Sequence, residues 1–247
     1  FYQISKNCVA EVRSSIGKER RKRRYGAMVR EANQPKRVEW AEEQKLTRQP
    51  FINHWFCDEA SVQAENESMY VLVDSNDPYA HVTPAPKNRY RVMIWIGISM
   101  MGATEIKILG PKETIKSEEY CRIIEEYYMP AAKQYYGNRC YLVHDNAPVH
   151  VSAHTKKRLE EMGVKVTEKW PAESPDCNPV ELVFAHLKDR LRNQYKPKNR
   201  AELVAAIKSF KEVYLTPEYC RKTIKHIHTA IPQVIRRKGL PVRGKKD

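Results

Sequence analysis

Long hydrophobic runs are absent from this sequence: no apolar stretch among its 247 residues approaches the roughly 18 residues that a membrane-spanning helix needs. Also absent are a C-x-x-C pair and a secretory signal at the amino end, and the six cysteines are widely spaced. The first absence argues against helical membrane spans, and the others argue against a disulfide framework or a zinc site. We therefore expect a soluble intracellular protein with reduced thiols and no membrane partner.

Acidic residues are also in short supply, with 30 Asp and Glu against 44 Lys and Arg, which leaves a net charge of +14. The excess lies at the two ends: residues 1–50 hold 13 Lys and Arg against 6 Glu, and residues 231–247 hold 6 against 1. A nearly neutral body with basic ends suits a polyanionic partner, because Lys and Arg gain affinity by displacing phosphate counterions. A merely solvated charged face is the alternative that composition leaves open.

The pattern of strands and helices predicts an α/β protein. Four apolar segments are predicted to be strands: 51–57, 69–73, 91–99 and 104–109. The first long helix is expected over 117–136, with an interruption at Pro130, and strand and helix then alternate through 141–143, 151–162 and 164–170. This order predicts one sheet covered by helices.

Two acidic residues in the second half of the chain occupy special positions. Asp145 follows the short strand predicted at 141–143, and Glu181 lies just inside a helix predicted to begin after Asn178, with Pro179 at its first position. The 35 residues between these acids hold one helix and one strand, so the two acids can meet. The alternative for Glu181 is a capping box with Asn178, in which the glutamate only closes the start of its helix.

Several motifs in order resemble those of Tc/mariner superfamily transposases. HDNAPVH and WPAESPDCNPVELVFAHLKDRL, which contain Asp145 and Glu181, are similar to the second and third acidic motifs, and NHWFCDEASVQAE, which contains Asp58, is similar to the first. The segment RVMIWIGISMMGATEIKIL resembles the strand pair that follows the first motif. The resemblance implies a ribonuclease H-like fold, with a central mixed sheet flanked by helices and a short helical remnant of a helix-turn-helix module at the amino end.

Two residues compete for the place of the first acid. Asp58 ends the segment 51–57 and its context resembles the family motif, whereas Asp74 ends the segment 69–73. We favour Asp58 because it also follows the first strand rather than the second. Asp74 is then expected to begin a turn.

The resemblance also implies a domain organisation. Residues 1–17 are expected to be the end of a helix-turn-helix module whose remainder lies upstream, since the chain begins at Phe1 without a methionine. A basic linker over 18–48, a catalytic domain over 49–238 with a clamp-like loop at 74–89, and a basic tail over 239–247 follow. The linker contains six cations that we expect to bind DNA or to act in nuclear import: Lys18, Arg20, Arg21, Lys22, Arg23 and Arg24.

Three acids of this kind imply metal-dependent phosphodiester chemistry. Asp58, Asp145 and Glu181 would be both catalytic residues and ligands of two Mg²⁺ or Mn²⁺ ions, which prefer oxygen donors. For that reason His144 and His150 are not expected to bind the metal, and Asn146 and His150 are candidates for holding the acids or contacting DNA.

The resulting hypothesis is a nuclear cut-and-paste DNA transposase that acts as a homodimer on double-stranded DNA, at terminal inverted repeats and at a target. Two alternatives from other classes remain. One is a transposase-derived DNA-binding protein without catalysis, and the other is a nuclease of the same fold that cuts without joining.

Overall fold

A computed structural model of the chain describes residues 29–63, 90–111, 113–137 and 139–242, together with four separate residues near the amino end. Those four, Cys8, Glu11, Val12 and Ser15, are helical. Several expectations lie outside the described residues: the basic run at 18–24, the strand at 69–73, Asp74, the loop at 74–89 and the last five residues of the tail.

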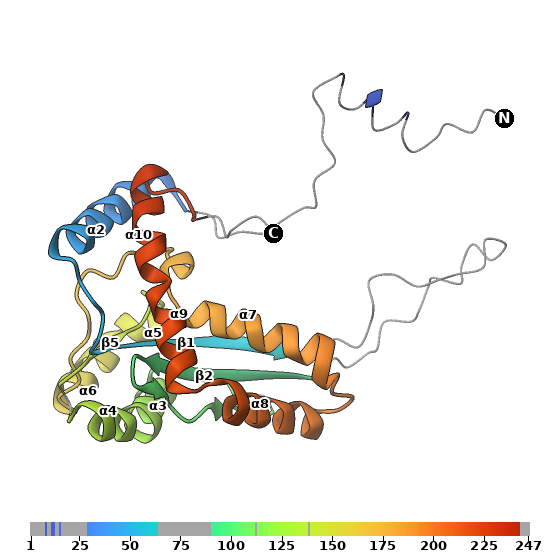
Figure 1. The fold of residues 1–247 in the computed structure, drawn as a ribbon. Helices are drawn as coiled ribbons and strands as arrows, with labels where there is room; N and C mark the ends of the chain where they lie inside the picture. The colour runs from blue at the N-terminus through green and yellow to red at the C-terminus, as the bar shows by residue number, and fades with distance from the viewer. Residues whose placement is uncertain are drawn as a thin grey trace.

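A mixed sheet of five strands lies at the centre of the described part of the chain (Figure 1). The strands are β1 (His54–Gln63), β2 (Arg91–Ser99), β3 (Gly102–Ala103), β4 (Lys107–Ile108) and β5 (Tyr141–Val143). The order is β3-β2-β1-β5, and β4 also pairs with β2. Because β1 is antiparallel to β2 and parallel to β5, the sheet is mixed, as expected.

Alternating side chains of β1 supply both cores. Phe56, Ala60 and Val62 belong to the larger buried cluster, and Trp55 and Cys57 belong to the smaller one. Successive residues of a strand point to opposite faces, so a single strand anchors helices on both sides.

Five helices contribute to the larger cluster: α2 (Gln34–Thr47), α7 (Val180–Arg190), α8 (Arg200–Tyr214), α9 (Pro217–Lys225) and α10 (Ile227–Arg236). The smaller cluster is formed with α3 (Ser117–Ile123), α4 (Met129–Tyr136) and α6 (Ala153–Glu161). Five further elements are single turns: the 3₁₀ turns η1 (Glu31–Asn33) and η3 (Pro175–Cys177), the π turns η2 (Ile124–Tyr128) and η4 (Leu191–Tyr195), and the helix α5 (Pro148–Val151). No helix in the described ranges is long and apolar enough to cross a membrane.

Three predicted strands differ from the observed ones. The strand predicted to end just before Asp58 instead continues to Gln63, because β2 pairs with it as far as Arg91. The strand predicted over 104–109 is reduced to the two residues of β4, and in place of the one predicted over 164–170 there is an isolated bridge between Val166 and Leu142. Asp58 therefore lies in the middle of a strand.

Helices are also divided more often than predicted. The helix expected over 151–162 is split at Ser152, whose hydroxyl accepts a hydrogen bond from the Thr155 amide and so caps α6. The interruption expected at Pro130 takes the form of a π turn, η2 (Ile124–Tyr128), just ahead of the proline. Proline has no N–H to donate to the preceding turn, which favours such a break.

The two ends of the described folded region meet. Helix α10 packs against α2, which begins the folded region (Figure 1). Gly239, just after α10, has a left-handed φ of +82°, and a Cβ at this position would come within 2.3 Å of the Gln34 carbonyl oxygen. Only glycine allows this close approach of the two backbones.

Candidate active site

Asp58 and Asp145 lie level with each other on neighbouring parallel segments. The register of β1 with β5 sets Phe56 opposite Val143, and each acid follows its strand residue by two positions. Since β5 ends at Val143, this side of β1 has no further strand neighbour among the described residues. The resulting gap leaves room for a pocket at the edge of the sheet.

A pocket of about 350 Å³ occupies this gap, and Asp58, Asp145 and Glu181 all line it. Glu181 enters from the first turn of α7, which runs along β1 (Figure 1). The structure thus brings the three predicted acids together at one cavity. No group of three His, Cys, Asp or Glu residues in the described ranges is arranged as a ready-made metal site.

Asp58 is the most strongly perturbed of the three acids. Burial, followed by the charge of Glu59, raises the pKa of its carboxyl to about 8, and Glu181 and Asp145 contribute in the same direction. One carboxyl oxygen accepts a hydrogen bond of 2.8 Å from the Glu59 amide, and the other accepts one of 3.2 Å from the Asn178 side chain. A carboxyl in this setting keeps its proton until a positive charge arrives.

Asp145 is held in the opposite electrostatic state. The hydrogen bond from His150 Nδ1 to Asp145 Oδ1, 2.7 Å long, is the largest cause of a lowered pKa of Asp145. The Ala147 amide donates to the same oxygen at 2.9 Å. Both hydrogen bonds end on Oδ1, so Oδ2 is the oxygen of Asp145 left to bind a ligand. The lowered pKa keeps Asp145 ionised at neutral pH.

Glu181 does not form the capping box considered above. Helix α7 begins at Val180, whose amide donates to the Asn178 side-chain oxygen at 3.4 Å, and the Glu181 carboxylate takes no part in this cap. The Asn178 side chain donates to Asp58, while the Asn178 backbone oxygen accepts a hydrogen bond from the Glu181 amide at 3.1 Å. Burial raises the pKa of Glu181, and the positive charge of Lys188 partly offsets this rise. The Glu181 side chain faces the pocket, and the predicted N-cap, Asn178, supports an acid as well as the start of the helix.

His150 links two acids across the sheet. Its ring is 2% exposed, and Nε2 lies 3.3 Å from Glu59 Oε1 while Nδ1 contacts Asp145. Although burial opposes protonation, the hydrogen bonds to Asp145 and Glu59 raise the pKa of His150 to about 10. Both ring nitrogens therefore donate at neutral pH. His144 stacks on this ring with centroids 5.0 Å apart, and its Nδ1 lies 2.6 Å from the Tyr120 hydroxyl.

The loop ahead of α7 is tied to the first helix of the folded region. Arg37 of α2 is 1% exposed, and its guanidinium donates two hydrogen bonds to Asp176, at 2.9 and 2.7 Å. The same group donates to Ser174 Oγ at 2.6 Å and to the carbonyl oxygens of Glu173 and Gly239. Asp176 also accepts from the Val242 amide. This buried contact fixes the loop that delivers Asn178 and Glu181.

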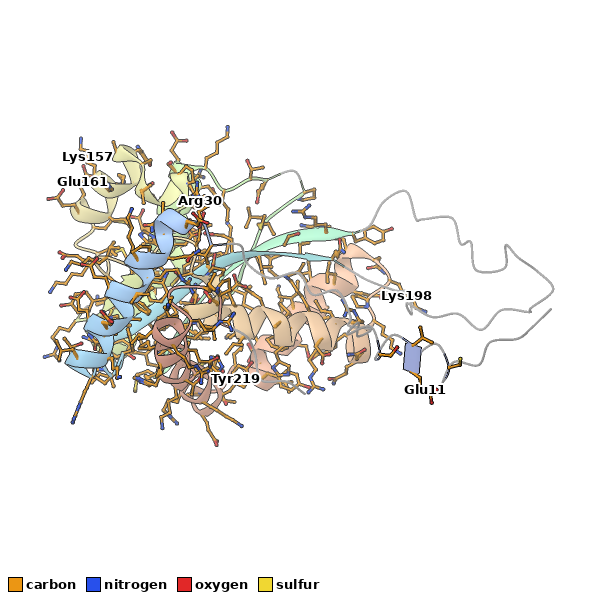
Figure 2. The ribbon with its side chains drawn as sticks, turned by 90° about the horizontal axis from the view of Figure 1, so that it is seen from above. Glu11, Arg30, Lys157, Glu161, Lys198 and Tyr219 are labelled. Atoms are coloured by element: carbon orange, nitrogen blue, oxygen red, sulfur yellow. The ribbon has the colours of Figure 1, made fainter. Side chains whose placement is uncertain are left out.

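Two further residues border the pocket. Arg30, labelled at the start of α2 in Figure 2, donates a side-chain hydrogen bond of 2.5 Å to Glu173 at the pocket rim. The side chain of Asn146 donates to the Trp170 carbonyl at 3.1 Å and so joins the Asp145 segment to the loop. Neither side chain contacts the three acids directly.

Three residues of the site were not identified from the sequence: Glu59, Asn178 as an acid partner, and Arg37. Glu59 follows an acid in the chain, but its role depends on pointing to the face opposite Asp58, where His150 lies. Arg37 lies 139 positions from Asp176, and no local pattern predicts that pair. The six cations at 18–24 lie outside the described residues.

The chain was compared with known families and proteins. Residues 53–204 match the family model of the DDE superfamily endonuclease. The human histone-lysine N-methyltransferase SETMAR is 30% identical over 178 residues, which cover 69% of this chain and 26% of that protein. The Tcb1 transposase of Caenorhabditis briggsae is 29% identical over 168 residues, covering 65% of this chain and 60% of the transposase. The chain thus spans well under two thirds of either relative.

Solved structures resemble the fold over nearly the whole chain. A Mos1 transposase paired-end complex with the left transposon end superposes with a TM-score of 0.78 at 19% identity, covering 97% of this chain and 72% of that one. A Mos1 mariner paired-end complex with Mn gives a TM-score of 0.77 at 20% identity, covering 96% and 71%. This likeness confirms the predicted ribonuclease H-like fold.

Proposed function

Because this chain belongs to the DDE superfamily endonucleases, in the Tc/mariner branch, we propose that it is the catalytic part of a cut-and-paste DNA transposase. Its substrates are the terminal inverted repeats of a transposon and a target DNA. Its reactions are cleavage at the transposon ends and transfer of the cut strand into the target. The chain would work with a DNA-reading module upstream of the described residues, and the cations Lys18, Arg20, Arg21, Lys22, Arg23 and Arg24 would contact phosphates.

One observation supports this function above the others: Asp58, Asp145 and Glu181, which lie far apart in the sequence, face a single pocket at the open edge of β1. Their mutual repulsion contributes to the raised pKa of Asp58. Clustered carboxylates with such repulsion are suited to divalent cations, whose charge removes the penalty. The donor set contains only oxygen atoms, which Mg²⁺ and Mn²⁺ prefer.

Asp58 and Asp145 would hold two such ions between them, and Glu181 would complete the second site. Two ions bound there would activate an oxygen nucleophile, neutralise the phosphate and stabilise the leaving oxygen. His150 keeps Asp145 Oδ1 occupied, which would leave Oδ2 to bind a cation, and Asn178 orients Asp58. In cleavage, water adds to phosphorus and the 3′ oxygen leaves with a proton. In joining, that 3′ hydroxyl attacks a target phosphodiester and displaces another 3′ oxygen.

The test uses the full-length protein with its upstream module, labelled terminal-repeat duplex and supercoiled target plasmid, with Mg²⁺, with Mn²⁺ or with chelator. We expect nicks at the repeat end only when a divalent cation is present, and joined product when a precleaved end is supplied. The variant Glu181→Gln serves as the matched control, because it keeps size and polarity and removes the ligand charge.

Each outcome decides between functions. Cleavage without joining of a precleaved end would support a nuclease of the same fold. DNA binding without cleavage under any cation would support a transposase-derived binding protein. Unchanged cleavage by Glu181→Gln would show that the pocket is not the site of chemistry.

We propose a homodimer and a nuclear location on weaker grounds. Two transposon ends must be brought together for excision, and a dimer supplies two pockets. The run Lys18–Arg24 is typical of a nuclear import signal. Light scattering of the DNA-bound protein and the location of a fluorescent fusion, with and without this run, test the two proposals.

A further inference from the structure

A second cavity lies at the carboxyl end of β1, beyond the acidic pocket at the middle of the strand, and the charged residues of its lining are all cations. It is about 280 Å³ in volume and is lined by Ser61, Gln63, Arg91, Lys188 and Arg192. Arg91 stands opposite Gln63 in the β1 to β2 pairing, while Lys188 and Arg192 come from α7 and the π turn η4 that continues it. Like charges gathered in one cavity repel each other and favour an anion between them.

The two cavities lie along one continuous face. Glu181, Ala185, Lys188 and Arg192 fall at helical spacings of four, three and four residues, which places them on one side of α7 and η4. Ala185, Lys188 and Arg192 are exposed. The charge of Lys188 offsets part of the burial-induced rise in the pKa of Glu181, so Lys188 lies close enough to the acidic pocket to interact with it. Beside this face, β1 beyond Phe56 has no strand neighbour on the β5 side within the described residues.

The separation of the cavities is obtained in two ways. From Asp58 to Gln63 is five strand residues, or about 17 Å at the usual rise. From Glu181 to Arg192 is eleven helical residues, or about 16 Å. Successive phosphates of one duplex strand advance by about 3.4 Å along the axis and also rotate around it, so they lie about 6–7 Å apart and the distance corresponds to about three nucleotides.

We propose that Arg91, Lys188 and Arg192 form a phosphate-binding site for the DNA strand whose scissile phosphate occupies the acidic pocket, about three nucleotides from the cut. This site rests on the proposed function, and it adds a contact in the catalytic domain to those expected from the basic linker. Arginine and lysine at this position hold the strand in register, so that acids which themselves repel phosphate receive it in the right place.

The test measures binding rather than chemistry. The triple variant Arg91→Gln, Lys188→Gln, Arg192→Gln removes the charges and keeps long polar side chains. Its matched control is Arg122→Gln, Lys133→Gln, Lys157→Gln, three exposed cations of α3, α4 and α6. Figure 2 places Lys157 at the far end of the molecule from Lys198, which follows η4. Both proteins, full length, bind labelled terminal-repeat duplex in chelator, so that the DNA stays intact.

We expect the slope of log affinity against log salt to fall by about one for each lost phosphate contact in the triple variant, and not in the control. Neutral methylphosphonate linkages two to four nucleotides from the cut should weaken binding by the wild type about tenfold and leave the triple variant unaffected. The same linkages ten or more nucleotides away should weaken both proteins equally.

Several results would overturn the site. Equal salt slopes and equal sensitivity to the neutral linkages in the wild type and the triple variant would do so. Displacement of DNA by inorganic phosphate in the wild type, with no effect of the neutral linkages, would assign the cavity to a free anion instead. If the protein cleaves DNA normally but its binding is unaffected by the neutral linkages, the phosphate-binding site is wrong and the proposed function stands. If the neutral linkages weaken binding but the protein never cleaves DNA, the proposed function is wrong and the phosphate-binding site stands.

Discussion

The acidic pocket has two walls that are built in different ways. On one side, Asp58 and Asp145 are placed by the register of two neighbouring strands, with His150 behind them. On the other side, Glu181 and Asn178 follow a loop whose position depends on Arg37 of a distant helix. The first wall is set by backbone pairing and the second by side-chain bonds across 139 residues. Substitutions of the acids in either wall should therefore abolish cleavage, whereas the free energy of unfolding should depend mainly on the side-chain bonds of the second wall.

The largest expected effect is the loss of cleavage when any of the three acids is neutralised. Asp58→Asn, Asp145→Asn and Glu181→Gln should each reduce the cleavage rate by roughly 10⁴-fold or more, the scale seen when a group central to the chemistry is removed. Binding of terminal-repeat DNA should remain near the wild-type level. Single-turnover cleavage and anisotropy binding measure the two, and a variant that lost both equally would indicate misfolding instead.

The second effect separates the walls by stability. Arg37→Met leaves the partly buried Asp176 with only the Val242 amide as a partner and should cost about 2–3 kcal/mol of the free energy of unfolding, below the range for a fully buried charge. The double variant Arg37→Met, Asp176→Leu should recover much of this stability. It should still cleave roughly tenfold to a hundredfold more slowly, because the loop no longer holds Glu181 in place. Urea unfolding and single-turnover rates test this, and wild-type rates in the double variant would contradict it.

The third effect concerns only the first wall of the acidic pocket, which contains Asp58, Asp145 and His150. His150→Asn keeps an N–H near the position of Nδ1, and so keeps the bond to Asp145, whereas His150→Gln keeps one near Nε2 and serves Glu59. We expect His150→Gln to weaken Mn²⁺ binding by about 10–100-fold, and His150→Asn to stay close to the wild type. Calorimetric titration with Mn²⁺ measures this without catalysis. Equal losses in the two variants would make His150 a packing residue only.

The smallest effect is a dependence of stability on pH. The folded state keeps the Asp58 proton up to about pH 8, whereas an unfolded aspartate loses it near its ordinary pKa of 3.8, so stability without metal falls as pH rises between these values. His54 and His144, whose pKa values burial lowers to about 4, oppose this trend only below pH 6.5. His150, with a pKa of about 10, adds to the loss above pH 6.5.

The informative window is therefore pH 6.5 to 8. In chelator, the free energy of unfolding of the wild type should fall across this window, by at most about 1.4 kcal/mol per pH unit for each group. Asp58→Asn should show a shallower fall, and saturating Mg²⁺ should flatten the wild-type curve. Identical slopes in the wild type and Asp58→Asn would argue against a protonated Asp58.

The same contrast explains how far the sequence could be interpreted. Asp145 after a short strand and Glu181 in the first turn of a helix were predictable because strand and helix periodicity are local, whereas the mixed sheet was expected only from the family resemblance. The predicted end of β1, just before Asp58, was wrong because pairing with β2 extends the strand five residues past Asp58. Asn178 does accept from the first amide of α7, as an N-cap would, but the sequence did not predict that its amide group also donates to Asp58. Contacts between distant segments, such as Arg37 with Asp176, leave no periodic trace.

Arg37, near the start of the folded region, and the Val242 amide, near its end, both bind Asp176, so the first and last segments of this region lie close together. A module attached upstream and another attached downstream would emerge side by side, and the intervening unit could be carried as a cassette within a longer protein without stretching its linkers. The match to a quarter of a much longer methyltransferase is in keeping with such modularity. Because Arg37 also binds the loop that precedes Glu181, a displacement of an attached module at this junction would be transmitted to that loop.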